Sequence, residues 1–334
     1  METASSPSIS VIIPTFRRPD SLARALRSVF AQTRADLILE IAVVDNAGEG
    51  SARGTVEALR PLSPAPLLYI HAAPPGVATA RNAGVAATAA PYVAFLDDDE
   101  DAHAGWLEAL YAVHQRCAAD VTFGPVAGRA PNAAAWKRPY LERFFSRMGP
   151  ETSGPSDAVY GCGNSLMTRA TALADPAPFD VRANDTGGED DRLFSDLRAK
   201  GARFAWAAEA VVDEHPLAHR ATLGYALSRA VSYGQSPCQL CWRRRERLGV
   251  AKWMLIGAGQ AVVFGTAALG LGLLGRPAWI STLDRAARGL GKVLWFHEFH
   301  FYGQGAARFA GSAGADGVAS FTATATKITQ TKSL

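Results

Sequence analysis

The chain has 334 residues, of which 48% are apolar, and a formal net charge of +3 at pH 7. This length exceeds the usual size of one domain, so one sizeable mixed domain with an appended piece is expected. The apolar content excludes disorder for most of the chain, and so small a charge argues against nucleic acid as a partner. Four cysteines, and an N-terminus without a basic and then apolar leader, indicate a reducing compartment.

Strand-like and helix-like patterns alternate along the first third of the chain. Residues 9–14 read as a buried strand, and residues 19–32 follow with apolar side chains at helical spacing. The alternation recurs in three further pairs: residues 40–45 and a segment from Ser51, residues 67–70 and a helix from about Val77, and residues 92–96 and a helix from Gly105. Four such units in succession predict an α/β fold, a mainly parallel sheet with helices on both faces.

Polar residues directly follow three of these strands. Thr15 and Arg17 come after the first strand, Asp45 ends the second, and residues 97–99 come after the fourth. In parallel sheets, ligands bind beyond the carboxyl ends of the strands, which lie along one edge. We therefore expect these residues to converge on one crevice.

The acidic run Asp-Asp-Asp-Glu at residues 97–100 is the most informative feature of the chain. Like charges at the mouth of a sheet repel one another unless a cation or a donor-rich ligand offsets them, and hard divalent cations prefer oxygen ligands. A Mg²⁺ or Mn²⁺ site with a phosphate ligand is one interpretation. A solvated acidic turn before the helix from Gly105 is the other.

The middle of the chain has a looser pattern. Residues 125–155 carry aromatic side chains among basic ones, and either a lid over a substrate or an ordinary packed excursion accounts for their spacing. Residues 159–167 then resemble a strand whose glycines let another group approach the backbone closely.

A second acidic group opens a helix directly after two glycines, at residues 187–191. Leu193, Phe194 and Leu197 lie at helical spacing from Asp190, so Asp190 is expected on their inward-facing side. Complementing the helix dipole is sufficient reason for the other acidic residues of this turn. An inward carboxylate at Asp190 suits a general base that deprotonates a hydroxyl.

Five motifs, in this order and spacing, resemble those of the family 2 glycosyltransferases with the GT-A fold. They are Ser-Val-Ile-Ile-Pro-Thr-Phe-Arg-Arg at residues 10–18, Val-Val-Asp-Asn at residues 43–46, Gly-Val-Ala-Thr-Ala-Arg-Asn-Ala-Gly at residues 76–84, Asp-Asp-Asp at residues 97–99 and Gly-Glu-Asp at residues 188–190. The resemblance covers roughly residues 8–225. A narrower likeness, to bacterial glucosyltransferases that build exopolysaccharides such as succinoglycan, adds Arg220 and residues 232–235.

The resemblance implies a binding site for a nucleotide sugar. It places Pro14, Thr15 and Asp45 around the nucleotide base, and Arg81 at the base or the diphosphate. Asp97 would face the ribose, and Arg17 and Asp98 would belong to the same donor side. Guanidinium groups beside a diphosphate are consistent with this assignment.

The resemblance also implies a metal ion and a catalytic base. Asp99 would hold Mg²⁺ or Mn²⁺ with His215 as a further ligand, although a histidine at a strand end is otherwise an ordinary hydrogen-bonded residue. Asp190 would deprotonate the acceptor hydroxyl as it attacks the anomeric carbon with inversion. Glu189 and Asn164 would lie on the acceptor side.

The carboxyl-terminal part contains an apolar segment, residues 253–274, that carries no formal charge and is long enough to span a membrane. Basic residues flank both its ends, so a re-entrant or interfacial hairpin at a membrane surface fits better than a single span. A buried core helix is the alternative. The chain is thus expected to divide into a catalytic domain at residues 8–225, a helical membrane-associated region at residues 226–310 and a disordered tail at residues 311–334.

These features together predict a metal-dependent, inverting glycosyltransferase at the cytoplasmic face of the inner membrane. The expected donor is a nucleoside-diphosphate sugar, with UDP-glucose favoured, and the expected acceptor is an oligosaccharide linked to polyprenyl diphosphate. Two alternatives remain from the sequence: a nucleotidyltransferase on a related α/β sheet, and a non-catalytic scaffold that binds nucleotide sugars.

Overall fold

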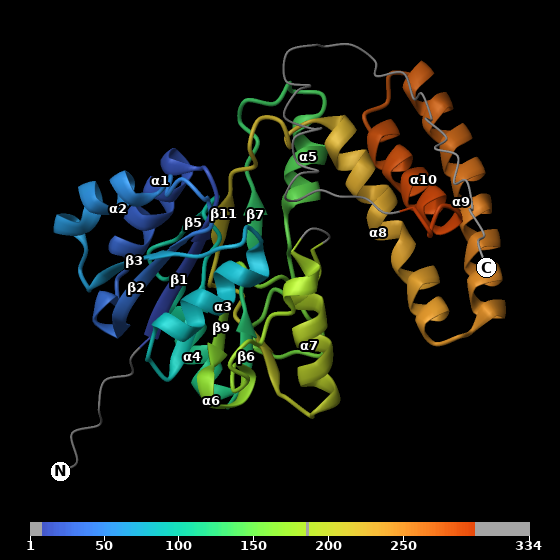
Figure 1. Ribbon diagram of the computed structural model, residues 1–334. Coiled ribbons are helices and arrows are strands. Elements are labelled where there is room, and N and C mark those ends of the chain that lie inside the picture. Colours follow the sequence, from blue (N-terminus) through green and yellow to red (C-terminus); the bar gives the residue numbers. More distant parts are fainter. Residues whose placement is uncertain (1–8, 185–186, 298–334) are drawn as a thin grey trace, which may run out of the picture.

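The computed structural model describes residues 9–184 and 187–297. A twisted eight-stranded sheet with helices on both faces forms the larger part, and a layer of long helices stands beside it (Figure 1). In spatial order the strands are β3 (Leu67–His71), β2 (Ile38–Asp45), β1 (Ile9–Thr15), β4 (Tyr92–Phe95), β9 (Ser165–Thr168), β6 (Val121–Phe123), β10 (Phe204–Trp206) and β8 (Gly154–Pro155).

The first four strands are parallel, as predicted: β1 pairs with β2 and β4, and β2 pairs with β3. Strand β9 runs antiparallel to both of its neighbours, β4 and β6, which the sequence did not indicate. The register pairs Phe123 at the end of β6 with Ser165 at the start of β9. The chain therefore leaves β6 and enters β9 at the same end of the sheet, so β9 must run antiparallel to β6.

Apolar residues cover both faces of this sheet, and alternation along β1 divides them into two cores. Val11 and Ile13 belong to one core, which also contains side chains of α1 (Pro19–Phe30), α2 (Arg53–Leu59) and α4 (Trp106–Arg116). Ile12 belongs to the other, with side chains of α3 (Val77–Ala87), α6 (Arg169–Ala172) and α7 (Glu189–Ala199). Short 3-10 turns, η1 (Ala35–Leu37), η2 (Arg60–Leu62) and η3 (Val181–Ala183), complete this part.

A three-stranded sheet follows the acidic run. Its strands lie in the order β5 (Glu100–Ala102), β11 (Val212–Glu214) and β7 (Val126–Gly128). The antiparallel pairing of β5 with β11 sets Glu100 opposite Glu214. Carboxylates from distant stretches of sequence are thereby brought next to the carboxyl end of β4.

Residues 125–155 form a packed excursion rather than an open lid. They include α5 (Arg138–Phe145), whose Tyr140 and Leu141 are buried against Ala226 and Ile280. The Tyr140 hydroxyl donates to Asp284 Oδ1 at 3.0 Å. This excursion therefore joins the sheet to the helical layer.

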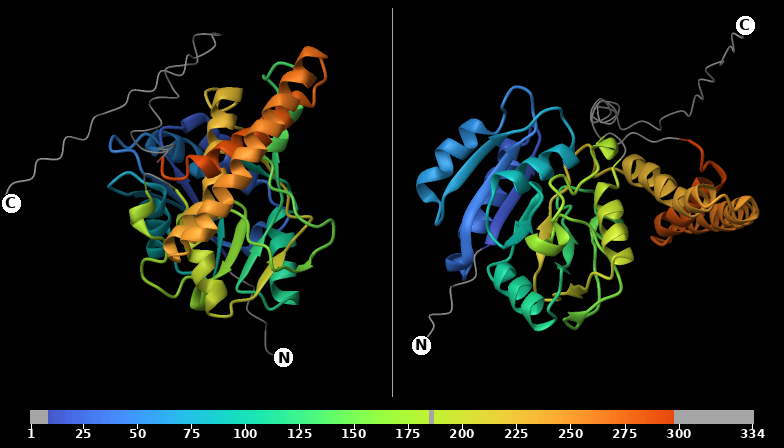
Figure 2. Two further views of the ribbon diagram at one scale, coloured as in Figure 1. Left: turned by 90° about the vertical axis from the view of Figure 1, so that its right-hand side faces the viewer. Right: turned by 60° about the horizontal axis from the view of Figure 1, so that its bottom comes forward.

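The helical layer consists of α8 (Leu223–Arg243), α9 (Arg247–Leu273) and α10 (Trp279–Val293), with α8 beginning before the predicted domain boundary at residue 225. Glycines let the helices approach closely: a Cβ on Gly289 would lie 2.7 Å from the backbone nitrogen of Ala261 and 2.8 Å from the carbonyl oxygen of Gly257. Two views in Figure 2 show α9 on the outer side of this layer, away from the sheet.

Helix α9 contains all but the last residue of the predicted apolar segment at residues 253–274. Within the described part of the chain it is the one helix long and apolar enough to cross a membrane, with a mean hydropathy of 1.7 in its most apolar stretch. Only 11% of that stretch is buried, so the alternative of a buried core helix is wrong. The predicted tail at residues 311–334 lies outside the described residues.

Candidate active site

The acidic run is a buried turn at the carboxyl end of β4. The amide of Glu100 donates to the carbonyl of Asp97, and the Glu100 carboxylate accepts from the Asp97 amide at 3.1 Å. Asp98 and Asp99 are 4% and 6% exposed. The interpretation of this run as a solvated acidic turn is therefore wrong.

Guanidinium groups neutralise the run. Nη1 of Arg18 donates to Asp98 at 2.7 Å and to Asp99 at 3.0 Å, and Arg220 lies 3.9 Å from Asp99. The Thr15 hydroxyl also donates to Asp98 at 2.7 Å. Burial raises the pKa of Asp98 to about 6, against the opposing charge of Arg18.

The arginine at this site is Arg18 and not the predicted Arg17. Arg17 has a φ of 57° and points outward, where it pairs with Glu49 at 2.6 Å in an exposed ion pair. Arg18 immediately precedes α1, and the turn into that helix directs its side chain toward the acids. Two adjacent arginines give no sequence signal that separates them, because the backbone turn decides which one faces inward.

The second acidic group comes from the first turn of α7. Gly187 and Gly188 have φ of 77° and 84°, a left-handed conformation that favours glycine, and they deliver the chain into this helix. Glu189 is 4% exposed, whereas Asp190 is half-buried and accepts from the amide of Cys162 at 3.2 Å. The most inward carboxylate is thus Glu189, which corrects the prediction for Asp190: Glu189, Leu193 and Leu197 repeat every four residues along the buried stripe.

Arg81 on α3 connects the two acidic segments. Its Nη1 donates to Glu189 and its Nη2 donates to Asp97 at 3.2 Å. Arg81 is only 4% exposed, and burial raises the pKa of Glu189 against the opposing charge of this arginine. In this structure Arg81 is therefore committed to protein carboxylates rather than presented to a ligand.

The predicted contacts to a nucleotide base lie within the protein interior. Asp45 is fully buried, and its carboxylate accepts from the amides of Ala47 at 3.0 Å and Ala52 at 2.7 Å and from the Tyr69 hydroxyl at 3.0 Å. Asp45 therefore holds the loop after β2. Pro14 is a buried strand residue next to β2.

His215 lies beside the acidic run. Its amide donates to the carbonyl of Asp99 at 2.8 Å, and its Nε2 lies 3.1 Å from Asp101 Oδ2. Sequence reasoning missed Asp101. No periodic signal marked it, because Asp99 lies in the turn before β5 and the strand begins only at Glu100.

Asn164 does not lie on an acceptor side. It is 1% exposed, its amide nitrogen donates to the carbonyls of Pro125 and Ala210, and its oxygen accepts from the indole of Trp106 at 2.8 Å. Its side-chain oxygen and nitrogen are both hydrogen-bonded to other core segments. This is the physical reason why the prediction for Asn164 is corrected.

Arg147 pairs with two acids, the buried Glu100 at the end of the acidic run and the half-buried Glu214, and the sequence did not indicate this pairing. It donates to Glu100 at 2.8 Å and to Glu214 at 3.3 Å. Burial raises the pKa of Glu100 well above its usual range and that of Glu214 to about 7, with Arg147 opposing both shifts. Burial is the largest cause of both rises, and the neighbouring carboxylates add to them.

Carboxylates gathered at one place suit a divalent cation. Within residues 9–184 and 187–297, no three acidic, histidine or cysteine side chains converge as a ready metal centre. Mg²⁺ that binds phosphates needs only one or two protein carboxylates, because the phosphates and water complete its shell. Asp99 directly precedes β5 and His215 directly follows β11, the strand paired with it, so these two residues would supply an oxygen and a nitrogen donor to a metal ion.

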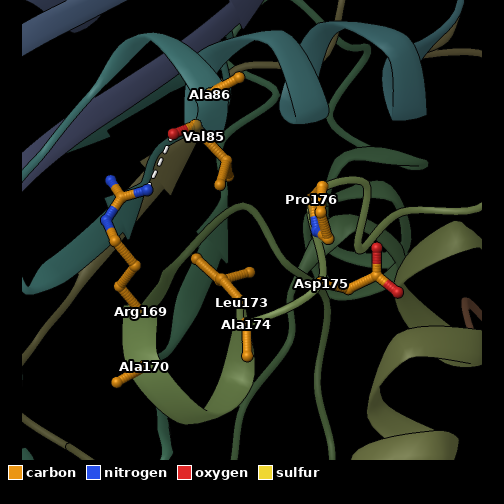
Figure 3. A pocket seen from close by; sticks show the side chains of 8 residues that line it. All are labelled: Val85, Ala86, Arg169, Ala170, Leu173, Ala174, Asp175 and Pro176. Atoms are coloured by element: carbon orange, nitrogen blue, oxygen red, sulfur yellow. Dashed lines mark hydrogen bonds between the residues drawn. The ribbon is translucent and has the colours of Figure 1, made fainter.

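A surface hollow beside α6 lies away from these acids. Register pairs Thr168 with Tyr92 at the amino end of β4, opposite to the end that carries the acidic run. Figure 3 shows Arg169 at this hollow, where its guanidinium donates to the carbonyl of Val85 at 2.8 Å. Since Arg169 also bonds the carbonyl of Ala90, it is committed to the fold, and the hollow is not the candidate site.

The parallel half of the sheet, with acids beyond the carboxyl ends of its strands, agrees with the GT-A fold expected from the sequence. The sequence model of glycosyl transferase family 2 matches residues 10–172. The chain is 33% identical over 253 residues to the succinoglycan biosynthesis protein ExoM of Rhizobium meliloti, an alignment that spans 75% of this chain and 80% of ExoM. The chain belongs to glycosyl transferase family 2.

Two further matches have lower sequence identity. The glycosyltransferase AglE of Haloferax volcanii is 28% identical over 263 residues, which is 76% of this chain and 82% of AglE. Among solved structures, TarS of S. aureus (residues 1–349, in complex with UDP-GlcNAc) is 18% identical, with a TM-score of 0.49 and coverage of 63% of this chain and 59% of TarS.

Proposed function

We propose that this glycosyltransferase moves glucose from UDP-glucose to a hydroxyl of an oligosaccharide on a polyprenyl diphosphate, with inversion, at the cytoplasmic face of the inner membrane. The observation that carries the proposal is the pair of acidic segments that Arg81 joins: the arginine-neutralised run at residues 97–99 and the first turn of α7. A displacement with inversion needs two such stations, one for the leaving group and one for the attacking alcohol.

On the donor side, Arg18 and Arg220 flank Asp99 and are suited to a diphosphate. Asp99 and His215 would hold Mg²⁺ or Mn²⁺, which when bound stabilises negative charge on the departing nucleoside diphosphate. Thr15 and Arg18 orient Asp98 and Asp99 by direct hydrogen bonds. The donor would therefore meet a rigid set of charged groups.

On the acceptor side, Asp190 is the general base. Asp190 is half-buried and its carboxylate accepts from the amide of Cys162, whereas the neighbouring Glu189 is buried and paired. Asp190 accepts the proton of the acceptor hydroxyl while that oxygen forms a bond to the anomeric carbon. The bond from this carbon to the diphosphate oxygen breaks on the opposite face, and UDP leaves with the electron pair.

Two observations support the cellular setting of the proposal. The exposed apolar surface of α9 suits contact with a bilayer, which would bring the site to an acceptor carried by lipid. The named role of ExoM in succinoglycan biosynthesis favours exopolysaccharide synthesis.

The test uses the full chain in lipid vesicles with Mn²⁺, UDP-glucose and a polyprenyl-diphosphate oligosaccharide. We expect UDP release and a product of inverted configuration, and a loss of turnover of about 10²-fold or more in Asp190→Asn with donor binding retained. Asp196→Asn, an exposed site on the same helix, is the matched control. Pyrophosphate release would instead identify a nucleotidyltransferase, and full turnover in Asp190→Asn would remove that residue as the base.

Metal dependence has a separate test. Chelation should abolish turnover and added Mg²⁺ or Mn²⁺ should restore it, while Asp99→Asn should raise the metal concentration needed for half-maximal rate. Turnover that persists after exhaustive chelation would contradict the metal assignment. A panel of nucleotide sugars, compared by thermal shift with and without metal, identifies the donor.

A further inference from the structure

The turn at residues 161–163, shortly before β9, contacts both acidic segments. The sequence indicated that its glycines let another group approach the backbone closely, and the structure identifies that group. On one side, the amide of Cys162 donates to Asp190 Oδ2 at 3.2 Å. On the other side, a Cβ on Gly163 would lie 2.4 Å from Asp97 Oδ2. One turn of backbone therefore separates the acidic run from the proposed base.

Glycine is required at position 163 for space rather than for conformation. Gly163 does not have a left-handed φ, so its backbone is one that other residues adopt. A Cβ there would nevertheless lie 2.8 Å from Asp97 Cγ and 2.9 Å from Glu100 Oε1, and Cβ atoms essentially never approach within 3.0 Å of another group. At Gly161 a Cβ would lie 3.4 Å from Arg147 Nε, an ordinary van der Waals distance. Of these two glycines, Gly163 alone makes room for carboxylates.

Hydrogen bonds hold the turn in a fixed position relative to the acidic run. The Ser165 hydroxyl donates to the carbonyl of Cys162 at 2.7 Å, and Ser165 pairs with Phe95 where β9 lies beside β4. Cys162 and Ser165 are both buried. The acidic run begins two residues after Phe95, so the turn and the run are anchored to the same pair of strands.

Asp97 is held against Gly163 but stays accessible. Arg81 Nη2 donates to Asp97 Oδ1 at 3.2 Å, whereas Oδ2 is the oxygen nearest to the position of a Cβ on Gly163. The side chain of Asp97 is 34% exposed, compared with 5% for Asp98 and 9% for Asp99. Of the three aspartates, Asp97 is therefore best placed to meet a ligand, and its position depends on the space at Gly163.

We propose that Gly163 is a positioning residue for the transfer reaction. Because it has no side chain, the Asp97 carboxylate lies against the turn whose amide orients Asp190, and this contact sets the separation between the donor side and the base. A side chain at position 163 would displace Asp97. The inference rests on the proposed function for its donor and its base, and it adds a residue that acts through Asp97.

The test compares Gly163→Ala with Gly161→Ala in the full chain, in lipid vesicles with Mn²⁺. UDP is the binding probe, since it carries the ribose that Asp97 is expected to face. Gly163→Ala should weaken UDP binding by about tenfold, as for one lost hydrogen bond. It should lower kcat/KM for UDP-glucose by about 10²-fold, because small displacements of groups at a reacting centre are costly. Gly161→Ala, the matched control, should change neither quantity.

A double variant tests whether Gly163 acts through Asp97. Asp97→Ala removes the carboxylate nearest to the added methyl group, so Gly163→Ala/Asp97→Ala should bind UDP as weakly as Asp97→Ala and no more weakly. If Gly163→Ala does not fold, the double variant should have the higher thermal unfolding temperature, because the close contact is relieved. Additive losses of UDP binding, or an unfolding temperature that does not recover, overturn the inference.

The wild-type protein separates failure of this inference from failure of the proposed function. If it binds UDP and transfers glucose, and Gly163→Ala behaves as Gly161→Ala does, the inference is overturned and the proposed function stands. If the wild-type protein neither binds UDP nor transfers glucose, the proposed function fails and the inference fails with it.

Discussion

Arg81 and Glu189, 108 residues apart in sequence, form a buried ion pair between the middle of α3 and the start of α7. The side chains of both are 5% exposed. Because Arg81 also reaches Asp97, this pair sets the spacing between the acidic run and the helix that carries Asp190. We therefore expect removal of this ion pair to lower both the stability and the activity of the protein.

Arg81→Met should destabilise the protein by about 3–5 kcal/mol, because it leaves the Glu189 carboxylate buried without a cation. The free energy of unfolding, from denaturant titration, measures this loss. Arg81→Met/Glu189→Met should recover part of it, since both charges are then absent. Arg17→Gln breaks an exposed ion pair and should leave the unfolding free energy unchanged; a similar loss in both single variants would refute the linking role of Arg81.

His114 should make stability depend on pH below neutrality. It is 2% exposed and lies between the hydroxyls of Thr122 and Thr168, and burial lowers its pKa to about 4. Between this value and the usual 6.5, the unfolded chain binds more protons than the folded one, so stability rises with pH in that window and is lost as pH falls through it. The expected slope from this residue is at most about 1.4 kcal/mol per pH unit.

Unfolding free energies at a series of pH values from 4 to 7 test this expectation. His114→Gln keeps a hydrogen-bonding side chain but does not titrate, so its profile should be flatter than that of the wild-type protein. Parallel profiles for the two proteins would show that the pH dependence arises elsewhere.

The glycine contacts between α9 and α10 predict opposite effects for two Gly→Ala changes. Gly289→Ala would place a Cβ 2.7 Å from the Ala261 nitrogen and should destabilise the helical layer by about 1–3 kcal/mol. Gly270 on α9 has no neighbour within 4 Å of a Cβ, so Gly270→Ala should be neutral or stabilise by up to about 1 kcal/mol. Thermal unfolding in detergent measures both, and equal effects would contradict close packing at Gly289.

The exposed face of α9 predicts how the protein associates with lipid. Val262→Asp/Leu269→Asp should reduce the vesicle-bound fraction in a flotation assay, since an aspartate costs about 3 kcal/mol at the centre of a bilayer. Leu62→Asp is the control, because Leu62 is 66% exposed on η2 of the sheet part. Unchanged flotation of the double variant would exclude α9 as the lipid contact.

Much of the fold could be predicted because its signals are local. The strand and helix units from β1 to α4 appear close to their predicted positions, and their alternation indicated the parallel half of the sheet. The antiparallel strand β9 could not be predicted in the same way. Its direction depends on where the excursion at residues 125–155 returns to the sheet, and short-range periodicity carries no information about that.

The candidate site also has features that the sequence predicts and features that only the tertiary structure decides. The sequence by itself determined which stretches carry acids, that one of them follows a strand and another opens a helix, and that an apolar segment lies near the carboxyl terminus. Tertiary structure alone decided that Arg18 rather than Arg17 meets the acids, that Glu189 is the more buried carboxylate of its turn, and that Asn164 closes the core. The physical reason is that charge pairing acts through space: a buried carboxylate takes as its partner whichever cation the packed backbone brings within reach, and that neighbour is set by the whole fold.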